Sequence, residues 1–103
     1  MPELEEILDY RDQYVIPLLD YDSKHNVSLL QTLNQYFKHN RNIKKTSAAL
    51  FTHYNTVTYR IERACELLNL NSDDGDDMLE LQLALKLHEM RPYDKQRNPQ
   101  NRR

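Results

Sequence analysis

Residues 46–61, TSAALFTHYNTVTYRI, hold the side chains of this chain that are best suited to recognising another molecule. Four hydrogen-bonding residues stand together at 53–56, and the cations Arg60 and Arg63 follow them. Amide and hydroxyl groups can pair with the edges of bases, whereas guanidinium groups suit phosphates. This order of side chains predicts contacts to a nucleic acid rather than covalent chemistry.

Two short helices joined by a tight turn are needed to present these groups. The first helix has an inward face formed by Ile43, Ser47 and Leu50. After a break at 52–55, a second helix spans 54–68, and its apolar face comprises Val57, Ile61, Ala64, Cys65 and Leu68. Asn69 is expected to end it in the left-handed conformation. Such a pair over 43–68 is typical of a helix-turn-helix, whose second helix enters the DNA major groove by its N-terminal end.

The charges of the chain are unevenly distributed, although the net charge is only −2. Residues 1–24 carry −5 and residues 64–90 carry −6, whereas residues 38–63 carry +5 and residues 91–103 carry +4. The positive segment 38–63 coincides with the predicted helix-turn-helix. Such an asymmetry indicates a polyanionic partner for that part of the chain.

The rest of the chain predicts an all-α fold, a compact bundle of five or six helices. A single glycine and the absence of tryptophan disfavour a turn-rich β protein, and apolar residues recur at helical spacing. We expect one helical domain over residues 1–91 and a polar, disordered tail over residues 92–103. The N-terminal helical segment, 3–24, should kink or break at Pro17, which lacks a backbone N–H. Beyond it, three residues should pack on the core: Leu18, Leu19 and Tyr21.

Two further helices complete the predicted bundle. Residues 28–38 form one, whose apolar residues are Leu29, Leu30, Leu33, Tyr36 and Phe37. A closing helix spans 74–90, with Asp74 as its N-cap and an inner stripe of Leu79, Leu83 and Leu87. The recognition helix is too short to be stable alone, so packing against these elements must hold it.

Metal sites and enzymatic activity are not expected. Four scattered histidines lack metal-ligand spacing: His25, His39, His53 and His88. The lone Cys65 is compatible with a reducing cytoplasm. The acidic run 73–77 fails as a calcium loop because Leu70 and Leu81 fall where carboxylates are required. With no signal peptide, apolar span or phosphate loop, we predict a cytoplasmic non-enzyme without cofactor, small-molecule ligand or membrane contact.

Three segments carry a family resemblance: LLQTLNQYF at 29–37, NTVTYRIER at 55–63 and LQLALKL at 81–87. Over about residues 16–90 the chain resembles the C-terminal domain of the PucR/CdaR-type bacterial transcription regulators, which govern purine catabolism, sugar-diacid use and related pathways. The family often has a basic residue where Tyr54 and Thr58 stand here. This departure from the family implies a different operator.

The resemblance implies that residues 54–68 are the DNA-reading helix. The predicted base contacts are Tyr54, Asn55, Thr58 and Tyr59. The predicted phosphate contacts are Arg41, Lys44, Lys45, Thr46, His53, Thr56, Arg60 and Arg63.

Several of these residues have structural alternatives. Asn55 either reads adenine through its carboxamide or satisfies a first-turn N–H. Tyr59 reaches a base or sugar, or else covers the neighbouring helix. Arg60 touches phosphate or braces the core through an acidic partner. His53 and Thr56 contact phosphate, or else serve as a helix cap and a backbone partner respectively.

We expect duplex DNA and a second copy of the protein as partners. Pairing, at least in the parent protein, is expected through an upstream region or through Leu4, Ile7, Leu8 and Tyr14. Family members usually carry a sensory region before this domain, so the chain is expected to be a fragment or a truncated member. In the alternative interpretation it is a helical protein–protein interaction module without DNA binding.

Overall fold

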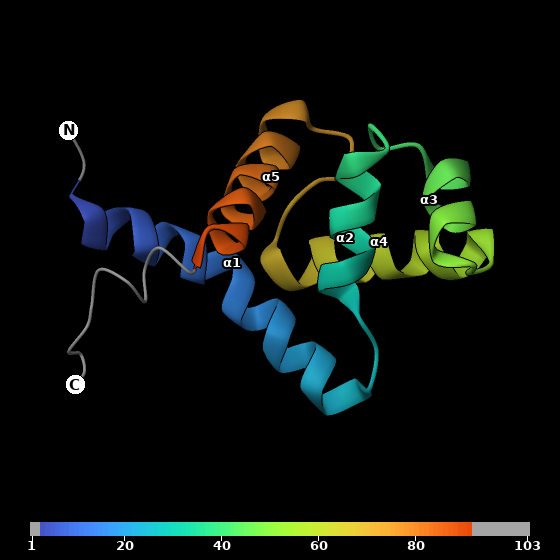
Figure 1. The fold of residues 1–103 in the computed structure, drawn as a ribbon, viewed down its shortest axis with the longest axis horizontal. Helices are drawn as coiled ribbons and strands as arrows, with labels where there is room; N and C mark the ends of the chain where they lie inside the picture. The colour runs from blue at the N-terminus through green and yellow to red at the C-terminus, as the bar shows by residue number, and fades with distance from the viewer. Residues whose placement is uncertain (1–2, 92–103) are drawn as a thin grey trace.

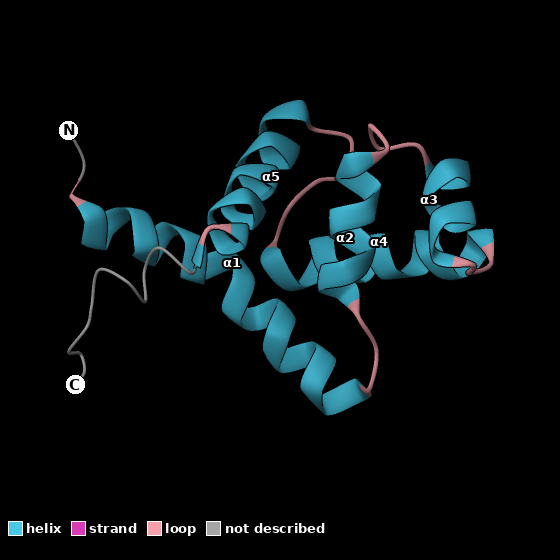
Figure 2. Cartoon of the chain, in the orientation of Figure 1, coloured by secondary structure: helices cyan, strands magenta, loops and turns pink. Residues whose placement is uncertain are grey.

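Five helices make up the part of the chain that this computed structural model describes, residues 3–91 (Figure 1). They are α1 (Leu4–His25), α2 (Leu29–Lys38), α3 (Ile43–Leu50), α4 (Tyr54–Leu68) and α5 (Gly75–Glu89). Within those residues there is no strand (Figure 2), which confirms the all-α prediction, and α4 has the predicted bounds. None of these helices has both the length and the hydropathy needed to cross a bilayer. The predicted tail, 92–103, lies outside the described residues.

The N-cap residues of all five helices are polar, and Glu3 and Glu6 form a capping box at the start of α1. The other four N-caps share one pattern. Each accepts a hydrogen bond from a first-turn N–H, and these N-caps are Ser28, Asn42, His53 and Asp74. Asp74 accepts from the N–H groups of both Asp76 and Asp77, so the acidic run 73–77 serves the start of α5. Asn69 ends α4 with a φ of 57°, which confirms the left-handed cap.

Pro17 lies inside α1, which continues across it without interruption. Of the predicted kink or break, the break is absent, and the ribbon of α1 changes direction along its length (Figure 1). A proline removes one backbone hydrogen bond and presses its ring against the carbonyl four residues earlier, which bends a helix without necessarily ending it. Leu18 is fully buried as expected, whereas Leu19, also expected in the core, is 44% exposed.

One hydrophobic core joins α1, α2, α4 and α5. Its fully buried members include Leu18 of α1, Leu33 of α2, Val57 of α4 and Leu81 of α5. The apolar face predicted for α4 is confirmed, since its buried residues are Val57, Ile61, Ala64 and Cys65, with Leu68 partly buried. Because this face holds α4 against the bundle, the opposite face of the helix is left to solvent.

The face that α5 buries differs from the predicted one. Leu79 and Leu83 are 63% and 51% exposed, and Leu87 is only half-buried. The buried residues are instead Met78, Leu81, Ala84 and Leu85. Leucines occur on several sides of this helix, so the i, i+4 spacing marks more than one candidate face, and the stripe we predicted was the wrong one.

Tyrosines of α1 tie this helix to α5. The Tyr10 hydroxyl donates to the backbone carbonyl of Glu80, and the Tyr14 hydroxyl donates to Glu80 Oε1 at 3.0 Å. Burial, together with the Glu80 carboxylate, raises the pKa of Tyr14 to about 12. The hydroxyl is therefore protonated at neutral pH and can act as the donor in this contact.

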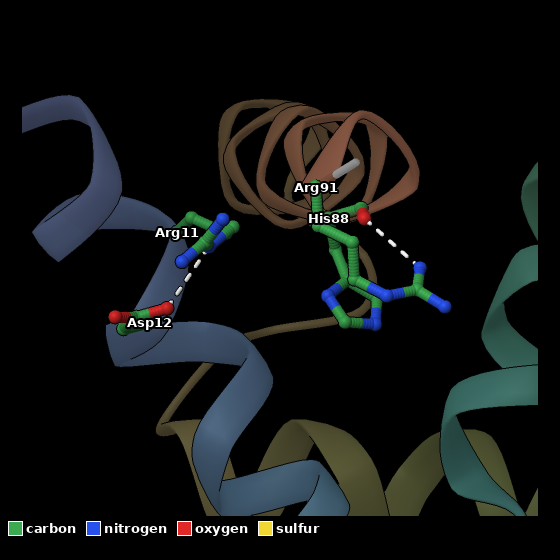
Figure 3. A network of polar contacts seen from close by, with 4 residues as sticks. All are labelled: Arg11, Asp12, His88 and Arg91. Carbon is green, nitrogen blue, oxygen red and sulfur yellow. Dashed lines mark hydrogen bonds and ion pairs between the residues drawn. The ribbon is translucent and has the colours of Figure 1, made fainter. Parts of the chain in front are cut away.

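A second set of polar residues lies where α1 faces the end of α5: Arg11, Asp12, His88 and Arg91 (Figure 3). Arg11 Nε of α1 lies 2.9 Å from Asp12 Oδ1, and Arg91 donates to the backbone carbonyl of His88 at 3.2 Å. Burial and the neighbouring cations Arg91 and Arg11 lower the pKa of His88. All four residues lie outside the helix-turn-helix.

We predict that Ile61→Ala lowers the free energy of unfolding by about 2–5 kcal/mol, because Ile61 is only 3% exposed and its truncation leaves a cavity. Thr58→Ala is the matched control on the same helix. Its hydroxyl is buried without a hydrogen-bond partner within residues 3–91, so removing it should barely change stability. Thermal and urea unfolding of both variants provide the test. A lower midpoint for Thr58→Ala than for Ile61→Ala would show that α4 is rotated from the orientation described.

Candidate nucleic-acid interface

Hydrogen bonds fix the turn between α3 and α4. Phe51 ends α3 with a φ of 52°, and its N–H donates to the Ala48 carbonyl at 3.3 Å. The Thr52 N–H donates to the Ser47 carbonyl at 3.1 Å, and the Ser47 hydroxyl donates to the Thr52 carbonyl. The turn therefore holds α4 at a set angle to α3, which is the arrangement of a helix-turn-helix.

The first turn of α4 presents hydrogen-bonding groups to solvent. His53 caps the helix, because its Nδ1 accepts from the Asn55 N–H at 3.0 Å. The structural alternative stated for His53 is thus confirmed. Tyr54 is 48% exposed, and Asn55 and Thr56 are exposed as well. The structure brings these four predicted contact residues together at one end of one helix.

A surface cluster follows on α4, formed by Tyr59, Arg63 and Glu66. Arg63 Nη2 donates to Tyr59 Oη at 3.1 Å, and Arg63 Nη1 lies 3.1 Å from Glu66 Oε1. The hydrogen bond from Arg63 lowers the pKa of Tyr59, and the same bond raises the pKa of Arg63. Arg63 is therefore held by two neighbours, and an incoming phosphate would compete with Glu66 for it.

Exposed cations gather near the start of α3: Arg41, Lys44 and Lys45. The Arg41 N–H donates to the Tyr36 carbonyl at 2.7 Å, which fixes the backbone of the loop before α3. Arg41 and Lys44 line an open hollow with Tyr54, so the first turns of α3 and α4 contribute to one surface. Figure 1 places α3 at the opposite end of the molecule from the start of α1. The acids that open α1 therefore lie far from this surface.

Neither helix of the motif has an acid in its first turn, whereas α1 begins with Glu5 and Glu6 and α5 with Asp76 and Asp77. The start of α2 also lacks an acid of its own, but Asp22 of α1 accepts from its N–H groups. A helix N-terminus carries partial positive charge. At α3 and α4 no acid of the first turn offsets that charge.

Three predicted contact residues are less accessible than expected. Thr46 is fully buried and its hydroxyl donates to the Asn42 carbonyl at 2.7 Å, so the predicted phosphate contact is wrong. The Thr58 hydroxyl is buried, so a hydrogen bond from it to a base is not supported either. Arg60 is half-buried and donates to the Thr32 hydroxyl at 3.5 Å, which supports the bracing alternative with a hydroxyl in place of the expected acid. Packing within the bundle, which helical spacing alone does not give, decides these burials.

Phe51 is an exposed aromatic residue that our sequence analysis missed. It is 97% exposed and stands directly between the two helices of the motif. The sequence did contain a signal, because a bulky residue occupies the position after a helix where glycine is usual.

The amino-acid sequence is similar to those of bacterial regulators. It is 43% identical over 76 residues to the Carbohydrate diacid regulator of Escherichia coli (strain K12), covering 73% of this chain and 20% of that protein. It is 32% identical over 95 residues to the Purine catabolism regulatory protein of Bacillus subtilis (strain 168), and the match covers 87% of this chain and 18% of that protein. A third relative, the Proline-responsive transcriptional activator PutR of Bacillus subtilis (strain 168), is 32% identical over 82 residues. That match covers 80% of this chain and 20% of that protein.

The chain spans about a fifth of the length of these curated relatives. No solved structure matches it. The model of the PucR C-terminal helix-turn-helix domain matches residues 29–87, which include α2, both helices of the motif and most of α5. That match covers more than half of the chain, and the chain therefore belongs to the family of helix-turn-helix domains found at the C-terminus of PucR-type transcriptional regulators.

Proposed function

We propose that this domain binds duplex DNA sequence-specifically, with the first turn of α4 in the major groove, as part of a transcriptional regulator in the bacterial cytoplasm. One observation carries the proposal. Exposed hydrogen-bonding side chains at the start of α4 adjoin exposed cations near the start of α3, at the end of the molecule away from the acidic start of α1. The names of the relatives, which are regulators or activators, support the same function.

Base reading is assigned to the outer face of α4. Asn55 is exposed in the first turn, and its carboxamide can form two hydrogen bonds with adenine. Tyr59 follows four residues later on the same face and is 53% exposed. Arg63 holds Tyr59 through their hydrogen bond and lies 5.7 Å from the centre of its ring. The Tyr59 hydroxyl is thus oriented before DNA arrives. Tyr54 supplies a third group beside the cations.

Phosphate binding is assigned chiefly to Arg41, Lys44 and Lys45, which are exposed beside the first turn of α3. His53 supplements them, because its Nδ1 accepts the capping bond and its Nε2 is left as a donor. Thr56 is exposed in the first turn of α4. Such contacts set the register of the protein on the duplex without reading sequence.

A second copy of the domain is the partner we propose for an apolar groove between α1 and α5. The groove is lined by Glu6, Ile7, Tyr10, Leu83 and Leu87. Helix-turn-helix proteins commonly pair on half-sites about 34 Å apart. The groove belongs to helices outside the motif, so pairing there leaves α4 free. Ile7 was among the predicted pairing residues, whereas Tyr14, also predicted, is bonded to Glu80 within the domain.

Asn55→Ala is predicted to weaken binding to the preferred site by about 1–3 kcal/mol and to affect random duplexes little, because it removes a base contact. Lys45→Ala should weaken both alike, because it removes a phosphate contact. The preferred site is first selected from random duplexes with the unmodified chain and then used in binding titrations.

Both residues are exposed, so both variants should melt like the unmodified chain. If Asn55→Ala kept the affinity and the selected sequence unchanged, the assignment of Asn55 to a base would be wrong. If the unmodified chain selected no sequence and bound no duplex at low salt, the interaction-module interpretation would replace the proposed function.

Glu66→Gln is predicted to raise the affinity for any duplex by up to about five-fold, because it frees Arg63, a predicted phosphate contact, from a weak surface ion pair. Glu89→Gln is the matched control. It removes the same charge from another i, i+3 pair, with Lys86 on α5. Equal effects of the two changes would mean that net charge alone, and not the release of Arg63, sets the affinity.

Leu83→Ser is predicted to weaken self-association, because Leu83 lines the apolar groove and is 51% exposed. Ile16→Ser is the control, since Ile16 is similarly exposed, at 56%, on α1 but outside that groove. Sedimentation equilibrium at micromolar concentrations should show dimers for the unmodified chain and the control, and mostly monomers for Leu83→Ser. A strictly monomeric chain, together with a selected site lacking an inverted repeat, would exclude this pairing.

A further inference from the structure

Phe51 is poorly suited to its position if folding alone is considered. Its φ of 52° is left-handed, a conformation in which the Cβ of an L-residue is strained and glycine is preferred. Its side chain is 97% exposed, so the phenyl ring gains nothing from burial in the core. Glycine at this position would remove both disadvantages. A role in folding therefore does not account for the phenylalanine.

The turn that carries Phe51 is held from both sides. The Phe51 N–H donates to the Ala48 carbonyl, and the next residue, Thr52, is bonded to Ser47 through both backbone and side chain. The Thr52 hydroxyl also donates to the Leu50 carbonyl at 3.0 Å. The phenyl ring is thus displayed from a fixed backbone, immediately before the helix that we assign to the major groove.

The surroundings of Phe51 favour a polyanion as its partner over an apolar protein surface. Phe51 stands just before the first turn of α4, where Tyr54 is 48% exposed, Asn55 and Thr56 are exposed, and no acid is present. The exposed Lys44 and Lys45 lie on the helix that Phe51 ends but in its first turn, at the opposite end. In the major groove of duplex DNA, the apolar group available for contact is the 5-methyl group of thymine.

We propose that Phe51 packs against a thymine methyl group at the edge of the major groove and so makes thymine part of the preferred site. The proposal rests on the proposed DNA binding and adds a residue and a base to it. The Phe51 contact would be apolar, in contrast to the hydrogen bonds assigned to Asn55 and Tyr59. Its energy depends on a methyl group that can be removed from the DNA without altering base pairing.

The test uses the full chain, its selected site, and copies of that site with uracil replacing each thymine in turn. Phe51→Gly should bind the thymine site roughly ten-fold more weakly, while its melting temperature stays the same or rises. At one position, replacing thymine by uracil should weaken binding by the unmodified chain about four-fold, which is the loss expected for one buried methyl group. The same replacement should leave binding by Phe51→Gly unchanged. Ile16→Ala, which removes apolar surface outside the motif, should bind like the unmodified chain.

Equal affinities of Phe51→Gly and the unmodified chain would overturn the proposal. The proposal would also be overturned if Phe51→Gly lost affinity while replacing thymine by uracil left the binding of the unmodified chain unchanged. The ring would then contact sugar rather than thymine. A Phe51→Gly variant that dissociates a dimer in sedimentation equilibrium and binds DNA weakly only for that reason would overturn it as well. If the unmodified chain binds no duplex at all, the proposed function itself fails, which is a separate result.

Discussion

The burial of one face of α4 is the interaction on which the rest of this structure depends. Val57, Ile61 and Ala64 are almost wholly removed from solvent against the other helices. A helix of this length has little stability in isolation, so its apolar face must supply what its backbone cannot. Because that face is turned inward, Asn55 and Tyr59 are turned outward, and the same packing that stabilises the domain decides which side chains can meet a ligand.

Electrostatics then distinguishes the starts of α3 and α4 from those of the other three helices. Acids open α1 and α5, where they offset the partial positive charge of each helix N-terminus, and Asp22 does the same for α2. The starts of α3 and α4 lack such acids, and exposed lysines stand beside one of them. The overall charge of −2 therefore says little about the partner. Its distribution favours a polyanion at the motif, whereas the apolar groove where we propose pairing lies between α1 and α5, outside the motif.

Much of this arrangement could be predicted from the sequence, because local signals and packing agreed. The bounds of α4, the caps at Asp74 and Asn69, and the buried face of α4 follow from side-chain type and helical spacing. The failures arose where tertiary contacts decide among locally equivalent choices. Leucines on several sides of α5 gave no unique inner face, and the burial of Thr46 depends on how α3 packs against α2 and α4. Pro17 lies inside α1, and the sequence alone could not decide whether the helix would bend there or end. The base and phosphate contacts remain predictions, since they depend on a partner.

The salt dependence of duplex binding by the full chain measures whether the exposed cations near α3 and α4 bind phosphate. If the exposed cations near α3 and α4 bind about four phosphates, the logarithm of the binding constant should fall with the logarithm of salt concentration with a slope of about −3 to −4. A double change of Lys44 and Lys45 to Ala should make that slope shallower by about two. A binding constant independent of salt, or a slope unaffected by removing both lysines, would show that these cations do not bind DNA phosphates.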